Sequence, residues 1–251
     1  MANPLLIVAG QSNCFGQTAT RILPDTYLNL PYLAWKWVPL NPSDPRERRT
    51  PWSPLRPTLS YDYAGSPSWP GPDLVVAKVL GEAGHTPTVI WHAAGATTLA
   101  VDWNATPAGM RLYTNLVAEV GKAFYSTNNP GGYSSSWLIW IQGESDGLNI
   151  NYKEDYKTNW DAFWPGLKTA LASSCPGLRC VAVKTSPNQT AVTYRTDMRT
   201  RFDEIAIAHA DVFLYDATPC AMAVDNMHYS ETGLVTLGEG IANLMIAAGD
   251  L

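Results

Sequence analysis

The sequence predicts an α/β fold in which a parallel sheet of five strands is covered by helices on both faces. Three observations lead to this prediction. Five short runs are rich in branched and aromatic residues, and each is apolar throughout. Segments with helical spacing of apolar residues lie between these runs. Because alternating strands and helices imply right-handed crossovers between parallel strands, we expect a three-layer α/β/α sandwich.

The expected strands show no alternation of apolar and polar residues, as a sheet covered on both faces requires. In chain order they are residues 5–9, 88–92, 136–141, 180–185 and 211–215.

The helices are expected where apolar residues recur every three to four positions. Asp73 is a candidate cap for the first helix. The apolar positions are Leu74, Ala77 and Leu80; Leu112, Leu116, Val120 and Phe124; Tyr156, Trp160, Phe163, Leu167 and Leu171; Met198, Phe202 and Ile205; and Leu234, Leu237, Ile241, Leu244 and Met245.

The 251 residues fit a single domain, 1–251, with a Pro/Trp-rich insertion at about 31–72. This insertion holds ten of the 19 prolines and four of the ten tryptophans. So much proline argues against a regular helix or a central strand there. Two interpretations stay open: an ordered wall over one edge of a functional site, or a loop that only covers one end of the core.

Composition excludes several classes of protein. With 46% hydrophobic and 16% charged residues and no long apolar run, the chain reads as globular and not membrane-spanning or disordered. Lys plus Arg number 17 and Asp plus Glu 22, so the net charge is 17 − 22 = −5. Without a basic run, nucleic acid is not an expected partner. The oligomeric state is not determined by the sequence.

The four cysteines, Cys14, Cys175, Cys180 and Cys220, have no metal-ligand spacing, so no metal and no cofactor are expected. Buried thiols, a Cys175–Cys180 disulfide and a Cys14–Cys220 disulfide all stay open. Residues 4–9 are too short for the apolar part of a signal peptide and lack a basic flank. We expect no export signal in this chain, and the compartment, extracellular after removal of a leader or cytoplasmic, stays open.

Polar residues follow the predicted strands at the point where each strand ends. In an open parallel sheet, ligands bind at this edge. The segments that follow the strands include residues 10–13, 94–98, 142–146 and, after a loop, 225–228. We therefore expect the functional site to combine these four segments.

The residue types in these segments fit nucleophilic catalysis. Ser12 lies just after the first strand, and serine needs a histidine to remove its proton and an acid to orient that histidine. His228 and Asp225, three residues apart, supply this pair. The N–H groups of Ser12 and Gly95 and the side-chain amide of Gln142 are candidate donors to an oxyanion.

Structural interpretations compete with each of these assignments. A serine after a strand often caps a helix, Gln142 can brace its own loop, and the chain lacks a complete G-x-S-x-G motif. Three other histidines exist, His85, His92 and His209, of which only His92 ends a strand near Gly95. Glu144 and Asp146 could form a glycosidase pair, but positions so close on one loop rarely span a sugar.

Four segments together resemble one known family. The four sequence blocks of the SGNH hydrolases are resembled by residues 5–13 (LLIVAGQSN), by residues 71–73 leading to 94–99 with Asp102-Trp103, by residues 140–146 (WIQGESD) and by residues 225–230 (DNMHYS). These segments are most similar to the blocks as they occur in the carbohydrate acetylesterases related to sialate O-acetylesterase and acetylxylan esterase. The resemblance extends from residue 5 to about 245, although Gly95-Ala96-Thr97 replaces the usual Gly-Gly-Thr.

The resemblance implies a flavodoxin-like fold and a serine esterase. Ser12 would be the nucleophile, His228 the base and Asp225 its orienting acid, and Glu144 would support the site. Ser12, Gly95 and Gln142 would form the oxyanion hole.

The expected substrate is an acetylated carbohydrate, hydrolysed through an acyl-enzyme. Tryptophans in segments that border the site, Trp103 and Trp69 among them, are candidates to stack on a sugar. Two alternatives remain: a lipase or thioesterase for longer acyl chains, and a carbohydrate-binding protein without catalysis.

Overall fold

The computed structural model describes residues 3–17, 35–37, 52–54, 58–59, 68–69, 71–105, 111–126, 129–249 and 251. For the short strands between residues 35 and 69, only the backbone is described. The predictions for the rest of the Pro/Trp-rich insertion lie outside the described residues.

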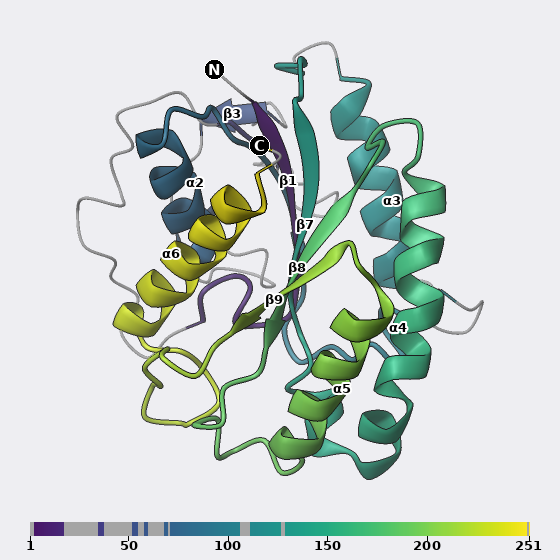
Figure 1. Cartoon of the computed structure of the whole chain (residues 1–251), viewed down its shortest axis with the longest axis vertical. Coiled ribbons are helices and arrows are strands. Elements are labelled where there is room, and N and C mark those ends of the chain that lie inside the picture. The colour runs from purple at the N-terminus through teal and green to yellow at the C-terminus, as the bar shows by residue number, and fades with distance from the viewer. Residues whose placement is uncertain are drawn as a thin grey trace.

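The five strands expected from the sequence form a parallel sheet through the middle of the molecule (Figure 1). They are β1 (Pro4–Gly10), β6 (Thr88–Ala93), β7 (Ser135–Ile141), β8 (Arg179–Lys184) and β9 (Val212–Asp216). Each differs from its predicted bounds by at most one residue at either end. Their order in the sheet is β6-β1-β7-β8-β9, so the chain moves to one side of β1 and then to the other. Such a reversal next to β1 creates a crevice at the carboxyl ends of the strands.

Helices cover both faces of this sheet, as the sequence predicts. On one face lie α2 (Pro72–Glu82) and α6 (Glu231–Ala248); on the other lie α3 (Arg111–Phe124), α4 (Ile150–Ala170) and α5 (Arg195–Ala208) (Figure 1). The central strand β1 shows the division directly. Leu6 and Val8 pack with the layer of α2 and α6, whereas Leu5 and Ile7 pack with the other three helices. All four side chains are fully buried, which explains why β1 is apolar throughout.

The Pro/Trp-rich insertion adds strands that the sequence analysis did not expect. β2 (Trp35–Trp37) pairs in parallel with β6, and β3 (Trp52–Pro54) pairs with β2 in the antiparallel sense at the edge of the sheet. β4 (Thr58–Leu59) and β5 (Ser68–Trp69) form a separate antiparallel pair. The expectation of no strand inside the sheet is wrong for β2, because its three residues lie between prolines and contain none. Pro54 stands at the edge strand, where a missing donor is tolerated.

Two local details correct the sequence analysis. Helix α2 begins at Pro72 with Gly71 as its N-cap, so Asp73 lies in the first turn and is not the cap. Pro at the start of a helix removes a donor that would have no partner there. The four cysteines are free and buried, so neither disulfide forms. The five tryptophans assigned to strands and helices are all buried, as expected: Trp91, Trp137, Trp140, Trp160 and Trp164.

Candidate active site

Ser12 lies on a tight turn directly after β1. Gly10, the last residue of the strand, has φ of +147°, and a Cβ atom there would lie 2.0 Å from the Ile141 carbonyl oxygen. Only glycine fits this approach to β7. The N–H of Gln11 then donates to the Ile141 carbonyl at 2.9 Å, and Cys14 N–H closes the turn onto the Gln11 carbonyl at 2.8 Å. The chain therefore leaves the sheet sharply and presents Ser12 at its carboxyl edge.

The structure brings Ser12, His228 and Asp225 into one chain of hydrogen bonds. His228 Nε2 lies 2.9 Å from Ser12 Oγ, and His228 Nδ1 lies 2.6 Å from Asp225 Oδ2. Ser12 is only 6% exposed, whereas the Asp225 side chain is 49% exposed. Both distances are those required for a base to take a proton from the hydroxyl while the carboxylate orients the ring.

The segment that carries the histidine is folded by the Asp225 carboxylate. Asp225 Oδ1 accepts from the backbone N–H groups of Met227 and His228, at 3.0 and 2.9 Å. Asn226 between them has φ of +52°, a left-handed conformation that asparagine tolerates better than most residues. Partial burial acts to raise the pKa of Asp225, but hydrogen bonds from His228 and Met227 outweigh it and hold the pKa below its ordinary value. Asp225 is therefore charged at neutral pH.

Two backbone N–H groups that the sequence analysis named as oxyanion donors have no acceptor in the described part of the protein. Within the described residues, the N–H groups of Ser12 and Gly95 donate no hydrogen bond to the protein. Gly95 lies on the turn that follows β6, where a Cβ atom would come within 3.2 Å of the Phe15 ring from the Ser12 turn. The next residue, Ala96, has φ of +56°. Ala96 stands where the resembled family usually has the second glycine of Gly-Gly-Thr, and glycine adopts a positive φ freely.

Gln142 is held differently from the expectation. Its Nε2 lies within hydrogen-bond distance of Asp146 Oδ2 (2.6 Å), the Thr97 carbonyl (3.0 Å) and Gln11 Oε1 (3.2 Å). Its Oε1 accepts from the Tyr156 hydroxyl at 3.0 Å, and the residue is 1% exposed. Because both amide N–H groups already have acceptors in the protein, the geometry favours Gln142 as a brace between loops over a donor to substrate.

Asp146 sits at the centre of this brace. Its carboxylate accepts from Gln142 and from the backbone N–H groups of Leu99 and Ala100, at 2.9 and 3.1 Å. It is fully buried, and this burial raises the pKa to about 6 even though hydrogen bonds from Gln142 and from backbone N–H groups act to lower it. Asp146 ties the loop after β7 to the loop after β6, which carries Gly95. A glycosidase pair of Glu144 and Asp146 is not supported, because both side chains are buried in contacts with the protein.

Glu144 belongs to a second buried network that includes two residues the sequence analysis did not assign. Glu144 Oε1 accepts from Asn13 Nδ2 at 2.5 Å and from Gln189 Nε2 at 3.2 Å. Both amides also reach the carbonyl of Met227, the residue before His228. The sequence analysis included Asn13 only as part of the first block and gave it no role. Gln189, in the loop after β8, lies in no motif that would have pointed to it.

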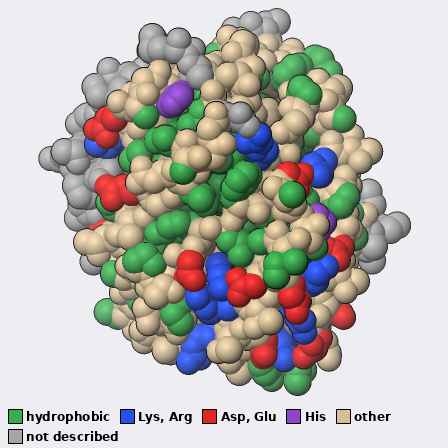
Figure 2. Space-filling model, viewed as in Figure 1, with side chains coloured by type: hydrophobic (Ala, Val, Ile, Leu, Met, Phe, Trp, Pro, Cys, Tyr) green, Lys and Arg blue, Asp and Glu red, His purple; other side chains and the backbone are tan. Residues whose placement is uncertain are grey.

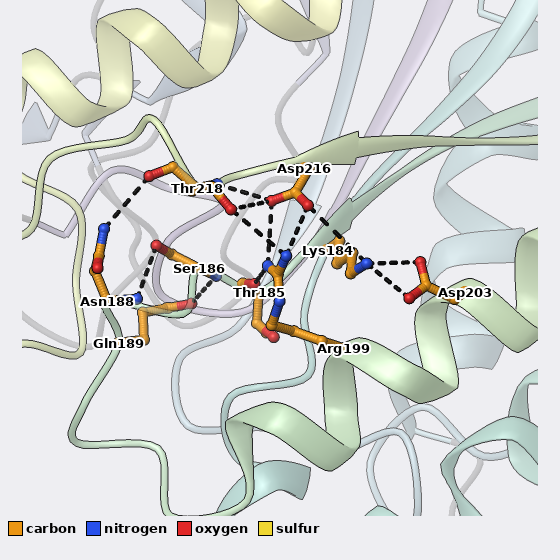
Figure 3. A network of polar contacts seen from close by, with 9 residues as sticks. All are labelled: Lys184, Thr185, Ser186, Asn188, Gln189, Arg199, Asp203, Asp216 and Thr218. Atoms are coloured by element: carbon orange, nitrogen blue, oxygen red, sulfur yellow. Dashed lines mark hydrogen bonds and ion pairs between the residues drawn. The ribbon is translucent and has the colours of Figure 1, made fainter.

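The loop after β8 is anchored by ion pairs at the ends of β8 and β9 (Figure 3). The Arg199 guanidinium pairs with both oxygens of Asp216, at 3.1 and 2.7 Å, and donates to the Thr185 carbonyl at 2.5 Å. Lys184 pairs with Asp203 of α5 at 2.6 Å. Burial acts to raise the pKa of Asp216, but hydrogen bonds from Arg199 and Thr218 outweigh it and lower the pKa to about 2. These contacts fix α5 and the start of the loop that holds Gln189.

His92, His209 and Trp103 contact protein groups other than the Ser12–His228–Asp225 chain. His92 contacts Trp103 edge-on at 5.7 Å between ring centroids, and burial lowers its pKa to about 4. His209 pairs with Asp161 of α4. Trp103 is fully buried, packs on Trp140 and donates to Thr97 Oγ1 at 3.0 Å. The prediction that Trp103 stacks on substrate is therefore wrong, because its indole belongs to the core. The side chain of Trp69 lies outside the described residues.

The described residues show no metal site, and the face seen in Figure 2 shows no surface of one sign. Within the described part of the chain, no cluster of three or more His, Cys, Asp or Glu residues could hold a metal ion. No described helix is long and apolar enough to cross a membrane. In Figure 2, acidic and basic side chains gather together over α4 and α5 and not in a patch of one sign.

Comparison with known proteins now identifies the family. A family model described as a carbohydrate esterase, sialic acid-specific acetylesterase, matches residues 2–247, nearly the whole chain. The chain belongs to this carbohydrate esterase family. This match confirms the family that the four sequence blocks indicated. The expected α/β/α fold is confirmed by the strand order β6-β1-β7-β8-β9 with helices on both faces.

The relatives and structural neighbours of this chain are distant in sequence. A probable carbohydrate esterase of Arabidopsis thaliana is 23% identical over 258 residues, which cover 98% of this chain and 91% of that protein. Its crystal structure superposes with a TM-score of 0.77 at 21% identity over the full length of both chains. NanS gives a TM-score of 0.72 at 13% identity, covering 98% of this chain and 97% of its own. A carbohydrate acetylesterase of Xanthomonas citri gives 0.66 at 14% identity, covering 96% of this chain and 55% of its own. At these identities the structural likeness shows the fold alone.

Proposed function

We propose that this carbohydrate esterase removes acetyl groups from sugar hydroxyls, with Ser12 as nucleophile, His228 as base and Asp225 as orienting acid. The observation that carries the proposal is the continuous hydrogen-bond chain from Ser12 Oγ through His228 to Asp225, at 2.9 and 2.6 Å. Ser12 and His228 lie 216 positions apart in the sequence, and family membership supports the ester substrate.

The geometry supports an acyl-enzyme sequence of two steps. In the first, His228 Nε2 takes the proton of Ser12 as Oγ attacks the carbonyl carbon of the ester. The resulting oxyanion accepts from the N–H groups of Ser12 and Gly95. His228 then gives its proton to the departing sugar oxygen, which leaves an acetyl group on Ser12. In the second step, His228 takes a proton from water as the water oxygen attacks the acyl carbon, and His228 then returns this proton to Ser12 Oγ as acetic acid leaves and ionises in solvent.

Gln142 has a supporting part in this proposal. Its amide connects Asp146, Thr97 and Gln11, so it holds the loops that carry Ser12 and Gly95. We expect Gln142→Ala to lower kcat through displaced loops and to lower the melting temperature at the same time. A loss of kcat of about 10²–10³ with an unchanged melting temperature would instead support direct donation to the oxyanion.

Substitution of the nucleophile tests the mechanism. Ser12→Ala should abolish ester hydrolysis and leave the melting temperature unchanged, because alanine fits the same turn without the hydroxyl. Ser135→Ala is a matched control, since its buried hydroxyl has no hydrogen-bond partner among the described residues. Mass spectrometry of wild type quenched during turnover should detect Ser12 carrying an acetyl group. Retained hydrolysis in Ser12→Ala would contradict the proposal.

A series of acyl lengths tests the substrate. We expect kcat/KM on chromogenic esters to fall from acetyl to octanoyl, and acetate to be released from an acetylated saccharide. A lipid groove would gain up to about 0.8 kcal/mol for each buried CH₂, so a steady rise with acyl length would favour a lipase or thioesterase. Acetylated xylan and O-acetylated sialic acid, compared directly, would separate the two sugar classes.

A further inference from the structure

The side chain of Asn13, next to the nucleophile, joins the backbone on both sides of His228. Its Nδ2 lies 3.3 Å from the Met227 carbonyl, and its Oδ1 accepts from the Tyr229 N–H at 3.0 Å. Asn13 itself is fully buried. One amide thus contacts the residue before the histidine as a donor and the residue after it as an acceptor.

The Asn13 amide supplies most of the direct hydrogen bonding between the nucleophile and the segment that carries the base. Between residues 11–13 and residues 223–229, the hydrogen bonds within the described chain are those of Asn13 and the Ser12–His228 bond itself. Tyr229 is fully buried in the same core cluster as Cys14 and Phe15, so burial anchors the end of the segment. The part before His228 is poorly covered, since Val224 is 90% exposed and the Asp225 side chain is 49% exposed. Burial therefore does little to hold Val224 and Asp225 in place.

The Asn13 amide is itself fixed by two buried side chains. Glu144 Oε1 accepts from its Nδ2 at 2.5 Å. Gln189 Nε2 reaches the same Glu144 oxygen at 3.2 Å and the same Met227 carbonyl at 2.9 Å, while Gln189 Oε1 accepts from the Ser186 N–H at 2.8 Å. The Gln189–Ser186 contact and the ion pairs that anchor its loop are visible in Figure 3.

We propose that Asn13 is a positioning residue that sets the distance between Ser12 Oγ and His228 Nε2, with Gln189 and Glu144 holding its amide in place. The inference rests on the proposed function, because it assigns Asn13 a part in the same proton transfer. Asparagine is required because a single short side chain must donate to one peptide group and accept from another. A displacement of about 1 Å between base and nucleophile is enough to cost roughly 10² in rate.

The first test removes the amide. We expect Asn13→Ala to lower kcat about 100-fold with KM changed less than about threefold, and to slow labelling of Ser12 by a fluorophosphonate by a similar factor. Asn129→Ala is the matched control, because Asn129 makes three hydrogen bonds near the start of β7, at the opposite end of the sheet. It should lose stability without losing kcat. Equal kcat in wild type and Asn13→Ala would overturn the proposal.

The second test uses Asn13→Asp and covers the case in which Asn13→Ala does not fold. This substitution would place a new carboxyl group beside that of Glu144, and two carboxylates so close cannot both ionise. When protonated, the new carboxyl group can still donate to Glu144 or to the Met227 carbonyl. We therefore expect Asn13→Asp to lose activity as pH rises, in a range where wild type keeps it. Wild-type pH dependence in Asn13→Asp would contradict the proposal.

A spectroscopic test separates failure of the inference from failure of the proposed function. Introduced alone, Ser12→Ala should shift the ¹⁵N NMR resonance of His228 Nε2, because it removes the hydrogen bond between Ser12 Oγ and His228 Nε2. In an Asn13→Ala background the same substitution should shift it much less. This comparison needs no ester hydrolysis, so an inactive wild type would overturn the proposed function alone. An equal shift in both backgrounds would overturn the role of Asn13 alone.

Discussion

At the scale of single residues, Asp225 has two tasks that one substitution separates. One oxygen faces the His228 ring, and the other accepts from two backbone N–H groups. In Asp225→Asn, the amide oxygen should keep accepting from the two backbone N–H groups, so the amide nitrogen faces the ring. The amide then donates to His228 Nδ1, which places the ring proton on Nε2, where it cannot accept the proton of Ser12. We expect kcat to fall by about 10³–10⁴, less than for His228→Ala. Steady-state kinetics of both variants measures this, and an equal loss would indicate that Asp225 does more than orient the ring.

Asp146 predicts how stability changes with pH. Burial raises its pKa in the folded protein to about 6, above the value of about 3.9 for an exposed aspartate. Folding therefore favours the protonated form, so the contribution of Asp146 to stability is greatest below about pH 4 and is lost as pH rises through about 6. The difference amounts to about 3 kcal/mol.

Urea unfolding of wild type and Asp146→Asn at pH 4 and pH 7 isolates this effect. The free energy of unfolding of wild type, relative to Asp146→Asn, should be higher at pH 4 than at pH 7, because only wild type titrates at this position. Other groups titrate in both proteins and cancel in the comparison. A difference that does not change with pH would show that Asp146 keeps an ordinary pKa.

At the scale of elements, the turn after β6 is strained at one position. Ala96 has φ of +56°, which costs a residue with a Cβ atom about 1–2 kcal/mol, whereas glycine adopts it freely. After allowance for the greater freedom of glycine in the unfolded chain, Ala96→Gly should raise the free energy of unfolding by about 0.5–1 kcal/mol.

Ala83, at the end of α2 with φ of −79°, supplies the matched control for this turn. Ala83→Gly should lower the free energy of unfolding, because no strain is relieved there. Urea unfolding measures both variants. If Ala96→Gly destabilises as much as Ala83→Gly, the turn is not strained, and the alanine at this position needs another explanation.

At the scale of the whole molecule, stability rests on packing without covalent links. All four cysteines are free and buried, and burial raises the pKa of the thiols of Cys175, Cys180 and Cys220. We expect a thiol reagent to modify none of the four in the folded protein and all four in urea. A reducing agent should leave the melting temperature unchanged. A melting temperature that falls on reduction would show that a disulfide does form.

The positions and bounds of the five strands could be predicted because burial on both faces leaves a local mark, a continuous apolar run. Their order in the sheet came only from the structure. The set of residues at the candidate site could be predicted from the strand positions, because parallel strands bring their carboxyl ends to one edge of the sheet. The short strand β2 was not predicted, because three residues are too few to show the hydrophobic pattern of a strand. Asp73 was assigned to the N-cap because aspartate often caps helices, but the helix starts at Pro72 and its N-cap is Gly71, two residues before the expected cap.

The sequence by itself therefore determined the α/β layers, the family and the set of polar residues at the carboxyl edge, all of which follow from residue type and spacing. Only the tertiary structure decided how each of those residues is used. Gln142 is braced by Asp146, Trp103 is buried in the core, and Asn13 contacts the segment on both sides of His228. The physical reason is that a polar side chain acts through whichever donors and acceptors surround it. For Asn13 the decisive partner, Tyr229, lies 216 positions away in the chain.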